Sequence, residues 1–420
     1  MEHVVTQIVM DPSQRFGFRR SPDLEVKFRA AAAKLLQTDG WVDPAAEAGN
    51  RYLVADLALQ GGGVKGIGLV GAILALSDAG YTFRGVAGTS AGAIAASLVA
   101  ALSLPGHDMA ELKPIMDSLI FEKFMPNGKL HQFLDNHFGP LADRVVDASI
   151  LLRRPGIYSG DYLTEWLGPV LAGLGVDKFC DLKLSASGDS DMSLPAGHEY
   201  SLVVHTSDIT RELLVHLPWE YGNYGRVADD MVVVDAVRAS MSIPFFFDPV
   251  AFPAEPVDIA LPLPDGSFIQ RHYDGGTVTW VDGGMLNNFP IHAFDRVDGK
   301  APRWPTIGVR LSALQTSFPP DRKCENSLSI ASQSLHTMLN EGDSYGVDPA
   351  TAGRTIFVDN AGISTTDFDI DKKQQDTLFL NGVSAATDFL ILMADFNHGN
   401  VPRTSNDGKS LVDRRRATVE

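Results

Sequence analysis

The sequence predicts an α/β protein with a mostly parallel central sheet, and three observations lead to this fold class. First, the apolar run at 52–59 is typical of a buried strand and ends at a Gln-Gly-Gly-Gly break. Second, helical spacing follows over 66–79, with Gly80 where a C-terminal cap belongs. Third, a strand over 82–87 leads through a glycine-flanked turn into a helix over 93–102. This alternation is typical of a βαβ unit, in which a right-handed crossover joins parallel strands.

Further elements are expected along the rest of the chain. Alternating or apolar runs predict strands, and longer amphipathic runs predict helices. We expect strands at 200–205, 212–217, 267–273, 277–281, 305–311 and 354–359, and helices at 232–241, 327–341 and 372–396. Asp274-Gly275-Gly276 lies between two of these strands, and Asp-Gly is a preferred hairpin turn, so a β-hairpin is predicted there.

The composition is that of a globular protein, with 45% hydrophobic and 21% charged residues. A formal net charge of -17 argues against nucleic acid as a partner, because binding to phosphates requires a net basic face. The same charge opposes attraction to anionic bilayers, so contact with lipid would depend on apolar side chains. Cys180 and Cys324 lie in dissimilar contexts and predict neither a disulfide framework nor a zinc site.

The glycine-flanked turn after the second strand has the pattern G-x-S-x-G. It comprises Gly88, Thr89, Ser90, Ala91 and Gly92. A strand entering such a turn and a helix leaving it define a nucleophile elbow, in which small neighbours permit a sharp bend at the serine. Ser90 would then lie at a helix N-terminus, where developing negative charge is stabilised. A serine N-cap in a tight turn is the simpler structural explanation, but the strand, the helix and a second glycine turn favour a nucleophile.

The first glycine turn satisfies G-x-G-x-x-G and admits two interpretations. It comprises Gly61, Gly62, Gly63, Val64, Lys65 and Gly66. A nucleotide-binding or dinucleotide-dependent protein would use such a turn for a pyrophosphate, but the next strand ends in Ser90 rather than in an acidic ribose ligand. An oxyanion hole fits better, with the backbone N–H groups of about Gly62 and Gly63 pointing at a carbonyl oxygen. Lys65 could add positive potential or be a solvated lysine on the first turn of the helix.

Asp-Gly-Gly occurs twice, and the two copies predict different roles. Asp274 is assigned to the predicted hairpin turn. Asp282 follows an apolar strand, and Gly283 and Gly284 open space beside its carboxylate. A carboxylate at a strand end can reach a nucleophilic serine directly. We therefore expect Asp282 to be the general base.

A Ser-His-Asp triad would require a late histidine in a strand-end loop. His292, His336 and His398 occur late, but none has that context, and each is interpreted as a surface or packing histidine.

With these residues in place, the chain resembles the patatin-like phospholipases over roughly 53–295. The resemblance rests on the two glycine turns, the block 239–249 (ASMSIPFFFDP), and Val281-Asp282-Gly283-Gly284 followed by Asn287, Asn288 and Pro290. It implies a three-layer α/β/α fold, a Ser-Asp dyad without histidine, an oxyanion hole in the first glycine turn, and hydrolysis of acyl esters in lipids. It also implies that Ser207-Asp208-Ile209-Thr210 is a scaffold turn. A catalytically silent scaffold with this fold is the remaining alternative.

The expected mechanism needs no metal and no cofactor. Asp282 would accept the Ser90 proton and later activate water. An exposed aspartate is a poor base at neutral pH, so burial must raise the pKa of Asp282 or the dyad must depend on proximity. The expected partners are a lipid or phospholipid substrate and, transiently, a membrane or micelle surface.

Apolar side chains are the candidates for lipid entry. The residues considered are Phe245, Phe246, Phe247, Phe252, Leu217, Trp219, Tyr221 and Tyr224. Core packing is the alternative for the Phe run, whereas the polar tips of the Trp-Tyr group suit a wet boundary, which favours Trp219.

Three parts are expected along the chain. Residues 1–50 form an N-terminal arm, residues 51–298 form the catalytic domain, and residues 299–420 form an extension packed on it, with a frayed tail after about 397. The first residues lack the order of a secretory signal, and the apolar stretch 91–104 is shorter than the roughly 20 residues that span a bilayer. We therefore expect a cytoplasmic protein.

Overall fold

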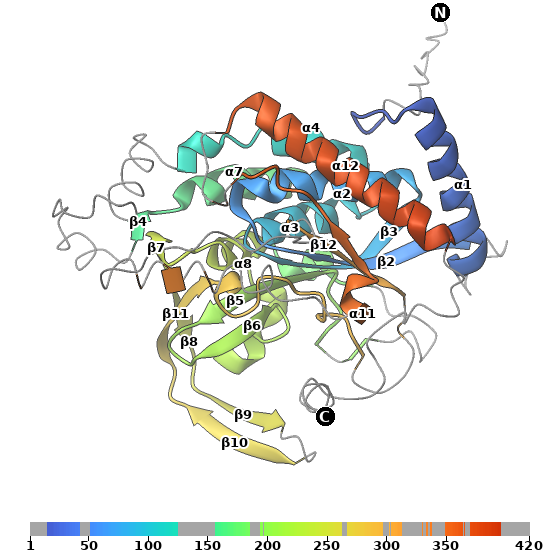
Figure 1. Ribbon diagram of the computed structural model, residues 1–420. Coiled ribbons are helices and arrows are strands. Elements are labelled where there is room, and N and C mark those ends of the chain that lie inside the picture. Colours follow the sequence, from blue (N-terminus) through green and yellow to red (C-terminus); the bar gives the residue numbers. More distant parts are fainter. Residues whose placement is uncertain are drawn as a thin grey trace, which may run out of the picture.

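A central sheet organises the computed structural model (Figure 1). The structure describes residues 15–42, 51–124, 156–184, 194–195, 197–262, 267–296, 302, 304–312, 330, 333–334, 337, 349–363, 365 and 370–395. Within these residues the central sheet has nine strands, in the order β13-β12-β2-β3-β5-β11-β8, with β1 paired to β2 and β6 paired to β5. The strands are β1 (Trp41–Val42), β2 (Arg51–Leu59), β3 (Tyr81–Thr89), β5 (Leu202–Asp208), β6 (Leu213–Leu217), β8 (Val250–Ala254), β11 (Gly276–Asp282), β12 (Thr306–Arg310) and β13 (Thr355–Phe357).

The middle of the sheet is parallel, as the sequence predicts. Strands β13, β12, β2, β3 and β5 pair in parallel, whereas β11 is antiparallel to both β5 and β8. Parallel neighbours end at the same edge, so the turns after β2 and β3 are brought together there. Because β12 pairs directly with β2, the segment after 298 contributes strands to the same sheet as the nucleophile turn.

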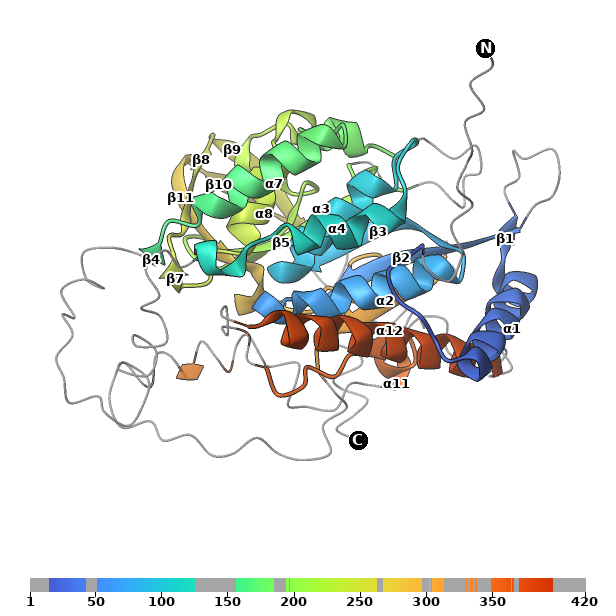
Figure 2. The same ribbon diagram turned by 90° about the horizontal axis from the view of Figure 1, so that it is seen from above.

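Helices flank this sheet, which confirms the predicted fold class of a mixed α/β protein (Figures 1 and 2). The helices are α1 (Pro22–Asp39), α2 (Ile67–Asp78), α3 (Ala91–Leu102), α4 (Leu112–Asp117), α7 (Asp161–Gly173), α8 (Val233–Ser240), α11 (Pro349–Ala352) and α12 (Lys372–Asp395). Helices α2 and α3 are apolar on nearly every side because both are buried, which explains their weak amphipathicity. The predicted helix at 372–396 is confirmed as α12, whereas most of the predicted helix at 327–341 lies outside the described residues.

Helix α12 packs along α2, as both ribbon views show (Figures 1 and 2). The two helices approach closely at glycines: a Cβ atom on Gly71 would lie 2.0 Å from the Phe379 carbonyl oxygen, and one on Gly382 would lie 2.0 Å from that of Gly68. Among the described helices, only α12 is long and apolar enough to cross a membrane by length and composition. Its buried residues, including Leu378 and Leu390, belong to the hydrophobic core, which accounts for its apolar character.

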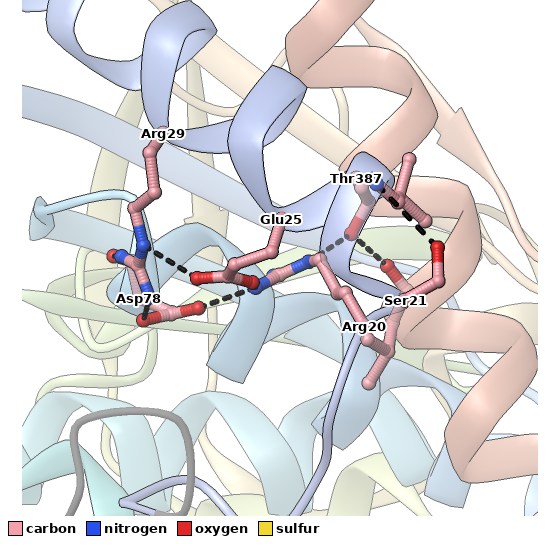
Figure 3. Close-up of polar contacts among 8 residues, drawn as sticks. Arg20, Ser21, Glu25, Arg29, Asp78 and Thr387 are labelled. Carbon is pink, nitrogen blue, oxygen red and sulfur yellow. Dashed lines mark hydrogen bonds and ion pairs between the residues drawn. The ribbon is translucent and has the colours of Figure 1, made fainter.

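The N-terminal arm is held against the sheet domain by a partly buried ion-pair network (Figure 3). The Arg20 guanidinium contacts the Asp78 carboxylate at 2.6 Å and donates to the Thr387 hydroxyl at 2.9 Å. Arg29 of α1 binds the other Asp78 oxygen at 2.7 Å. The Arg20 and Asp78 side chains are only 3% and 8% exposed. The described part of the arm therefore joins the end of α2 to α12.

The predicted hairpin around Asp274 is wrong. Strand β10 (Phe268–Tyr273) pairs with β9 (Val257–Pro262) in a separate two-stranded sheet, whereas β11 pairs with β5 and β8. The residues between β10 and β11 thus connect two sheets. Gly275 and Gly276 have φ angles of 82° and 107°, so a left-handed backbone still explains the two glycines.

Most of the apolar candidates for lipid entry belong to the core. Leu217, Tyr221 and Tyr224 are at most 1% exposed, and Phe246, Phe247 and Phe252 are also buried. Trp219 follows β6, whose Leu217 pairs with Val204 of β5. Val204 lies two residues before Thr206, the β5 partner of Asp282. Its ring stacks on His198 with centroids 4.2 Å apart. Trp219 is half-buried, and its place at a lipid entrance stays a prediction, whereas Phe245, on β7 (Phe245–Phe247), is 49% exposed.

Candidate active site

Ser90 lies at a strained elbow between β3 and α3. Its φ and ψ are 54° and -124°, a conformation that residues other than glycine rarely adopt, and its side chain is buried. The flanking glycines are required by close contacts: a Cβ on Gly88 would lie 2.2 Å from the Gly92 carbonyl oxygen, and one on Gly92 would lie 2.2 Å from that of Leu59. Backbone strain at a residue with a reactive side chain is typical of functional sites.

The first glycine turn lies directly against this elbow. A Cβ on Gly61 would be 3.1 Å from the Ser90 Cβ and 2.2 Å from Oδ1 of Asn288. Gly63 has a φ of 55°, and a Cβ there would be 2.0 Å from the Thr365 carbonyl oxygen. The two turns therefore meet at one sheet edge, as the parallel topology predicts.

The backbone N–H groups of the first glycine turn differ in whether they donate a hydrogen bond. Gly61 N–H donates to the Asn288 carbonyl at 3.0 Å, Val64 N–H to the Thr365 carbonyl at 3.3 Å, and Lys65 N–H to the Gly62 carbonyl at 3.2 Å. Within the described part of the chain, no backbone or side-chain group accepts a hydrogen bond from Gly62 N–H or Gly63 N–H. These are the two amides that the sequence singles out for the predicted oxyanion hole.

Lys65 is buried rather than solvated, with 6% of the residue exposed. Its Cε lies 3.5 Å from the position that a Cβ on Gly62 would occupy. The aliphatic stem therefore packs beside the turn, which excludes the interpretation of Lys65 as a solvated surface lysine.

Asp282 ends β11 opposite Thr206 of β5 and is fully buried. Its Oδ1 accepts a hydrogen bond from Gly284 N–H at 2.7 Å, so the Asp-Gly-Gly turn orients the carboxylate. Oδ2 is buried and accepts no hydrogen bond from the described residues. A Cβ on Gly283 would lie 2.2 Å from the His205 carbonyl oxygen, which explains why this position needs glycine.

Burial raises the pKa of Asp282 to about 7, and the Ser90 hydroxyl and the Gly284 amide oppose this rise by stabilising the carboxylate. Near neutral pH the group is thus divided between its acid and its carboxylate form, which is the range suited to a general base. The sequence argument requires burial to raise the pKa of Asp282, and the structure shows this rise. Its cause is desolvation.

Asn287 and Asn288 join the three turns. The Thr89 hydroxyl donates to the Asn287 carbonyl at 3.1 Å, and Asn287 N–H donates to the Gly283 carbonyl at 2.9 Å. Asn288 Nδ2 donates to the Gly61 carbonyl at 3.2 Å. Both asparagines are visible in the sequence after Asp-Gly-Gly, but their contacts depend on long-range packing.

The other sequence candidates lie away from this arrangement. The Asp274 side chain is 98% exposed beside His272. His292 binds Asp295 at 2.7 Å in a cluster with Arg354, whereas His336 and His398 lie outside the described residues. Asp208 accepts hydrogen bonds from the Thr210 and Arg211 amides, as a scaffold turn requires.

The sequence argument missed one buried histidine next to the site. His205 of β5 pairs with Thr89, and its ring packs edge-on against that of His216, with centroids 4.6 Å apart. Burial, together with His216, lowers the pKa of His205, so its ring is neutral. Among the residues that the structure describes, no group of three or more His, Cys, Asp or Glu side chains is placed to hold a metal ion.

Comparison with known families identifies the class of protein that this fold and site define. The family model of patatin-like phospholipases matches residues 57–295, more than half of the chain. The chain therefore belongs to the patatin-like phospholipase family, which places it among the lipid hydrolases.

Two relatives match most of the chain. It is 30% identical over 320 residues to the uncharacterized protein YqhO of Bacillus subtilis (strain 168), covering 76% of this chain and 92% of YqhO. It is 22% identical over 366 residues to the uncharacterized protein R571 of Acanthamoeba polyphaga mimivirus, covering 82% and 96% of the two chains.

Solved structures show more distant similarity. VipD from Legionella pneumophila is 16% identical with a TM-score of 0.41, covering 84% of this chain and 70% of VipD. The type III effector ExoU is also 16% identical, with a TM-score of 0.37 and coverage of 87% and 58%.

Proposed function

We propose that the protein hydrolyses acyl ester bonds of lipids, with Ser90 as nucleophile and Asp282 as general base. The observation that carries this proposal is the buried Asp282 carboxylate, with a pKa of about 7, that interacts with the hydroxyl of a serine on a strained elbow. Family membership supports lipid as the substrate class.

In the proposed reaction, Ser90 Oγ attacks the acyl carbonyl carbon while Asp282 accepts the hydroxyl proton. The carbonyl oxygen becomes negative and is stabilised by the Gly62 and Gly63 amides, which have no acceptor among the described residues. Asp282 returns the proton to the leaving alcohol, and an acyl-serine remains. A water molecule then gives its proton to Asp282 and attacks the acyl carbon, and that proton returns to Ser90 as the fatty acid leaves.

The proposed contact with a membrane or micelle surface uses apolar side chains near the dyad. Phe245 is 49% exposed and lies three residues after Ser242, whose carbonyl accepts a hydrogen bond from Asp282 N–H. Leu286 is 48% exposed and lies two residues after Gly284, which binds Asp282. These side chains provide apolar contacts where a net charge of -17 provides no electrostatic attraction.

The contacts of the first glycine turn disfavour the dinucleotide alternative. Gly61 packs against Ser90, and Gly63 is covered by the Thr365 carbonyl. A pyrophosphate would require this turn to be open at the start of its helix.

Covalent labelling tests the proposed nucleophile. Because Asp282 activates Ser90, a fluorophosphonate should label the wild-type protein stoichiometrically, and peptide mass spectrometry should locate the adduct on Ser90. Ser90→Ala should abolish the adduct, and Asp282→Asn should slow its formation by about 100-fold or more. Labelling at another residue, or unchanged labelling of Ser90→Ala, would remove Ser90 from the mechanism.

A further inference from the structure

The block 239–249 has no part in the proposed chemistry, yet it contacts both members of the dyad. Helix α8 ends at Ser240, which is fully buried and whose Oγ accepts a hydrogen bond from Ser90 N–H at 2.9 Å. Two residues later, the Ser242 carbonyl accepts a hydrogen bond from Asp282 N–H at 2.9 Å. One short segment therefore binds the backbone of the nucleophile and that of the base.

The hydrogen bond at Ser90 has a specific physical consequence. The Ser90 carbonyl is already fixed, because it accepts hydrogen bonds from Ala93 N–H at 2.8 Å and Ile94 N–H at 3.3 Å in the first turn of α3. Strained conformations persist only when surrounding contacts determine them. On the N–H side of the elbow, the Ser240 hydroxyl supplies that contact.

The segment itself is anchored on its other side. Arg238 is 8% exposed and donates to the Ser242 hydroxyl at 2.5 Å. The same guanidinium donates to the carbonyls of Ser159 and Asp248, the latter at 2.9 Å. Residues 240–242 are thus held between these anchors and the dyad, and they cannot move without disturbing the spacing of Ser90 and Asp282.

We propose that Ser240 is a positioning residue: its hydroxyl holds the Ser90 backbone at the angle that presents the nucleophile to Asp282, while the Ser242 carbonyl fixes Asp282 from the same segment. This inference rests on the proposed function. It assigns to Ser240 a role that acts through the Ser90 amide and without contact with substrate.

The test compares two buried serines. Ser240→Ala removes the acceptor for Ser90 N–H, whereas Ser97→Ala removes an equally buried hydroxyl that only donates to the Ile94 carbonyl within α3. On a soluble aryl ester, Ser240→Ala should lower kcat about 10- to 100-fold with KM changed less than twofold, because misplacement of a nucleophile impairs the chemical step. Ser97→Ala should keep wild-type kcat, and Ser240→Thr, which retains a hydroxyl, should recover most of it.

Hydrogen–deuterium exchange provides a readout that does not need activity. In Ser240→Ala, peptides covering 86–94 should exchange at least tenfold faster than in wild type or Ser97→Ala, with similar melting temperatures. Unchanged exchange in these peptides, or a kcat within twofold of Ser97→Ala, would overturn the positioning role. Exchange could accelerate although the wild type neither reacts with fluorophosphonate nor turns over esters. In that case the positioning of the Ser90 backbone by Ser240 is supported, and the proposed hydrolase function fails.

Discussion

At the scale of single residues, Asp282, the proposed general base, shows how the environment that a base requires conflicts with stability. The carboxylate is fully buried, and one of its oxygens accepts no hydrogen bond from the described residues. Burial of a charge that is incompletely paired disfavours the folded state. The same desolvation gives Asp282 a pKa of about 7, which a general base at neutral pH requires.

This conflict predicts a pH-dependent gain in stability for Asp282→Asn. The pKa is about 7 in the folded state and 3.8 for the ordinary group, so between these values only the folded protein holds the proton. The contribution of Asp282 to stability should therefore fall as pH rises from 4 to 7 and then level off, and the difference between wild type and Asp282→Asn isolates it from other titrating groups. The shift of about three units corresponds to on the order of 4 kcal/mol, an upper bound for the stabilisation by Asp282→Asn at pH 8. Urea unfolding at pH 5 and pH 8 measures the difference in free energy of unfolding between Asp282→Asn and the wild type. A gain in stability that is equal at the two pH values would contradict the burial argument.

The sequence predicts Ser90, Asp282 and the pair Gly62 and Gly63 because local chemistry restricts these positions. Small residues around Ser90 are needed for a sharp turn, and Asp-Gly-Gly at a strand end opens space for a carboxylate. Ser240 and Asn288 could not be assigned in the same way. Their partners, Ser90 and Gly61, lie far away in the sequence, and only the folded chain brings them into contact.

At the scale of elements, strand and helix positions follow from the sequence, but their pairing follows only in part. The parallel strands β2 and β3 are predicted correctly because a short crossover leaves few alternatives. The hairpin at Asp274 is wrong because β11 pairs with β5 and with β8, which lie earlier in the chain. Local turn chemistry at Asp-Gly contains no information about these distant partners.

The contact between α2 and α12 predicts a strong dependence on one glycine. A Cβ on Gly382 would lie 2.0 Å from the Gly68 carbonyl oxygen, so Gly382→Ala must push the helices apart and should destabilise the protein by about 1–3 kcal/mol. Gly173→Ala is the control, because a Cβ at the end of α7 meets no atom within 4 Å, and alanine favours a helix. Thermal unfolding should show a lower Tm for Gly382→Ala only. Equal Tm values for the two variants would show that the helices do not pack as described.

At the scale of the whole molecule, the net charge of -17 shapes how the protein meets its substrate. Long-range attraction to an anionic surface is absent, so association with lipid must depend on exposed apolar groups. The sequence argument named suitable residue types and favoured Trp219, which the structure shows half-buried, because local composition does not distinguish a buried aromatic side chain from an exposed one.

Lipid access predicts a selective effect of Phe245→Ala. Removal of this half-exposed ring should lower activity on vesicle phospholipid about tenfold and leave activity on a soluble monomeric ester within twofold. Phe268→Ala is the control, because Phe268 is 64% exposed on the β9–β10 sheet, which projects from the body of the molecule (Figure 1). Initial rates on vesicle phospholipid and on the soluble ester give the ratio of the two activities for each variant. Equal losses on both substrates, or the same selective loss in Phe268→Ala, would place the lipid contact elsewhere.

The central claim is that Ser90 and Asp282 together hydrolyse lipid acyl esters. Its most direct test is the release of free fatty acid from phospholipid vesicles, quantified by mass spectrometry, for the wild type, Ser90→Ala, Asp282→Asn and the exposed control Asp274→Asn. We predict fatty acid release by the wild type and by Asp274→Asn at similar rates, and a loss of at least 100-fold in Ser90→Ala and Asp282→Asn. Folded Ser90→Ala or Asp282→Asn protein that releases fatty acid at the wild-type rate would contradict the account.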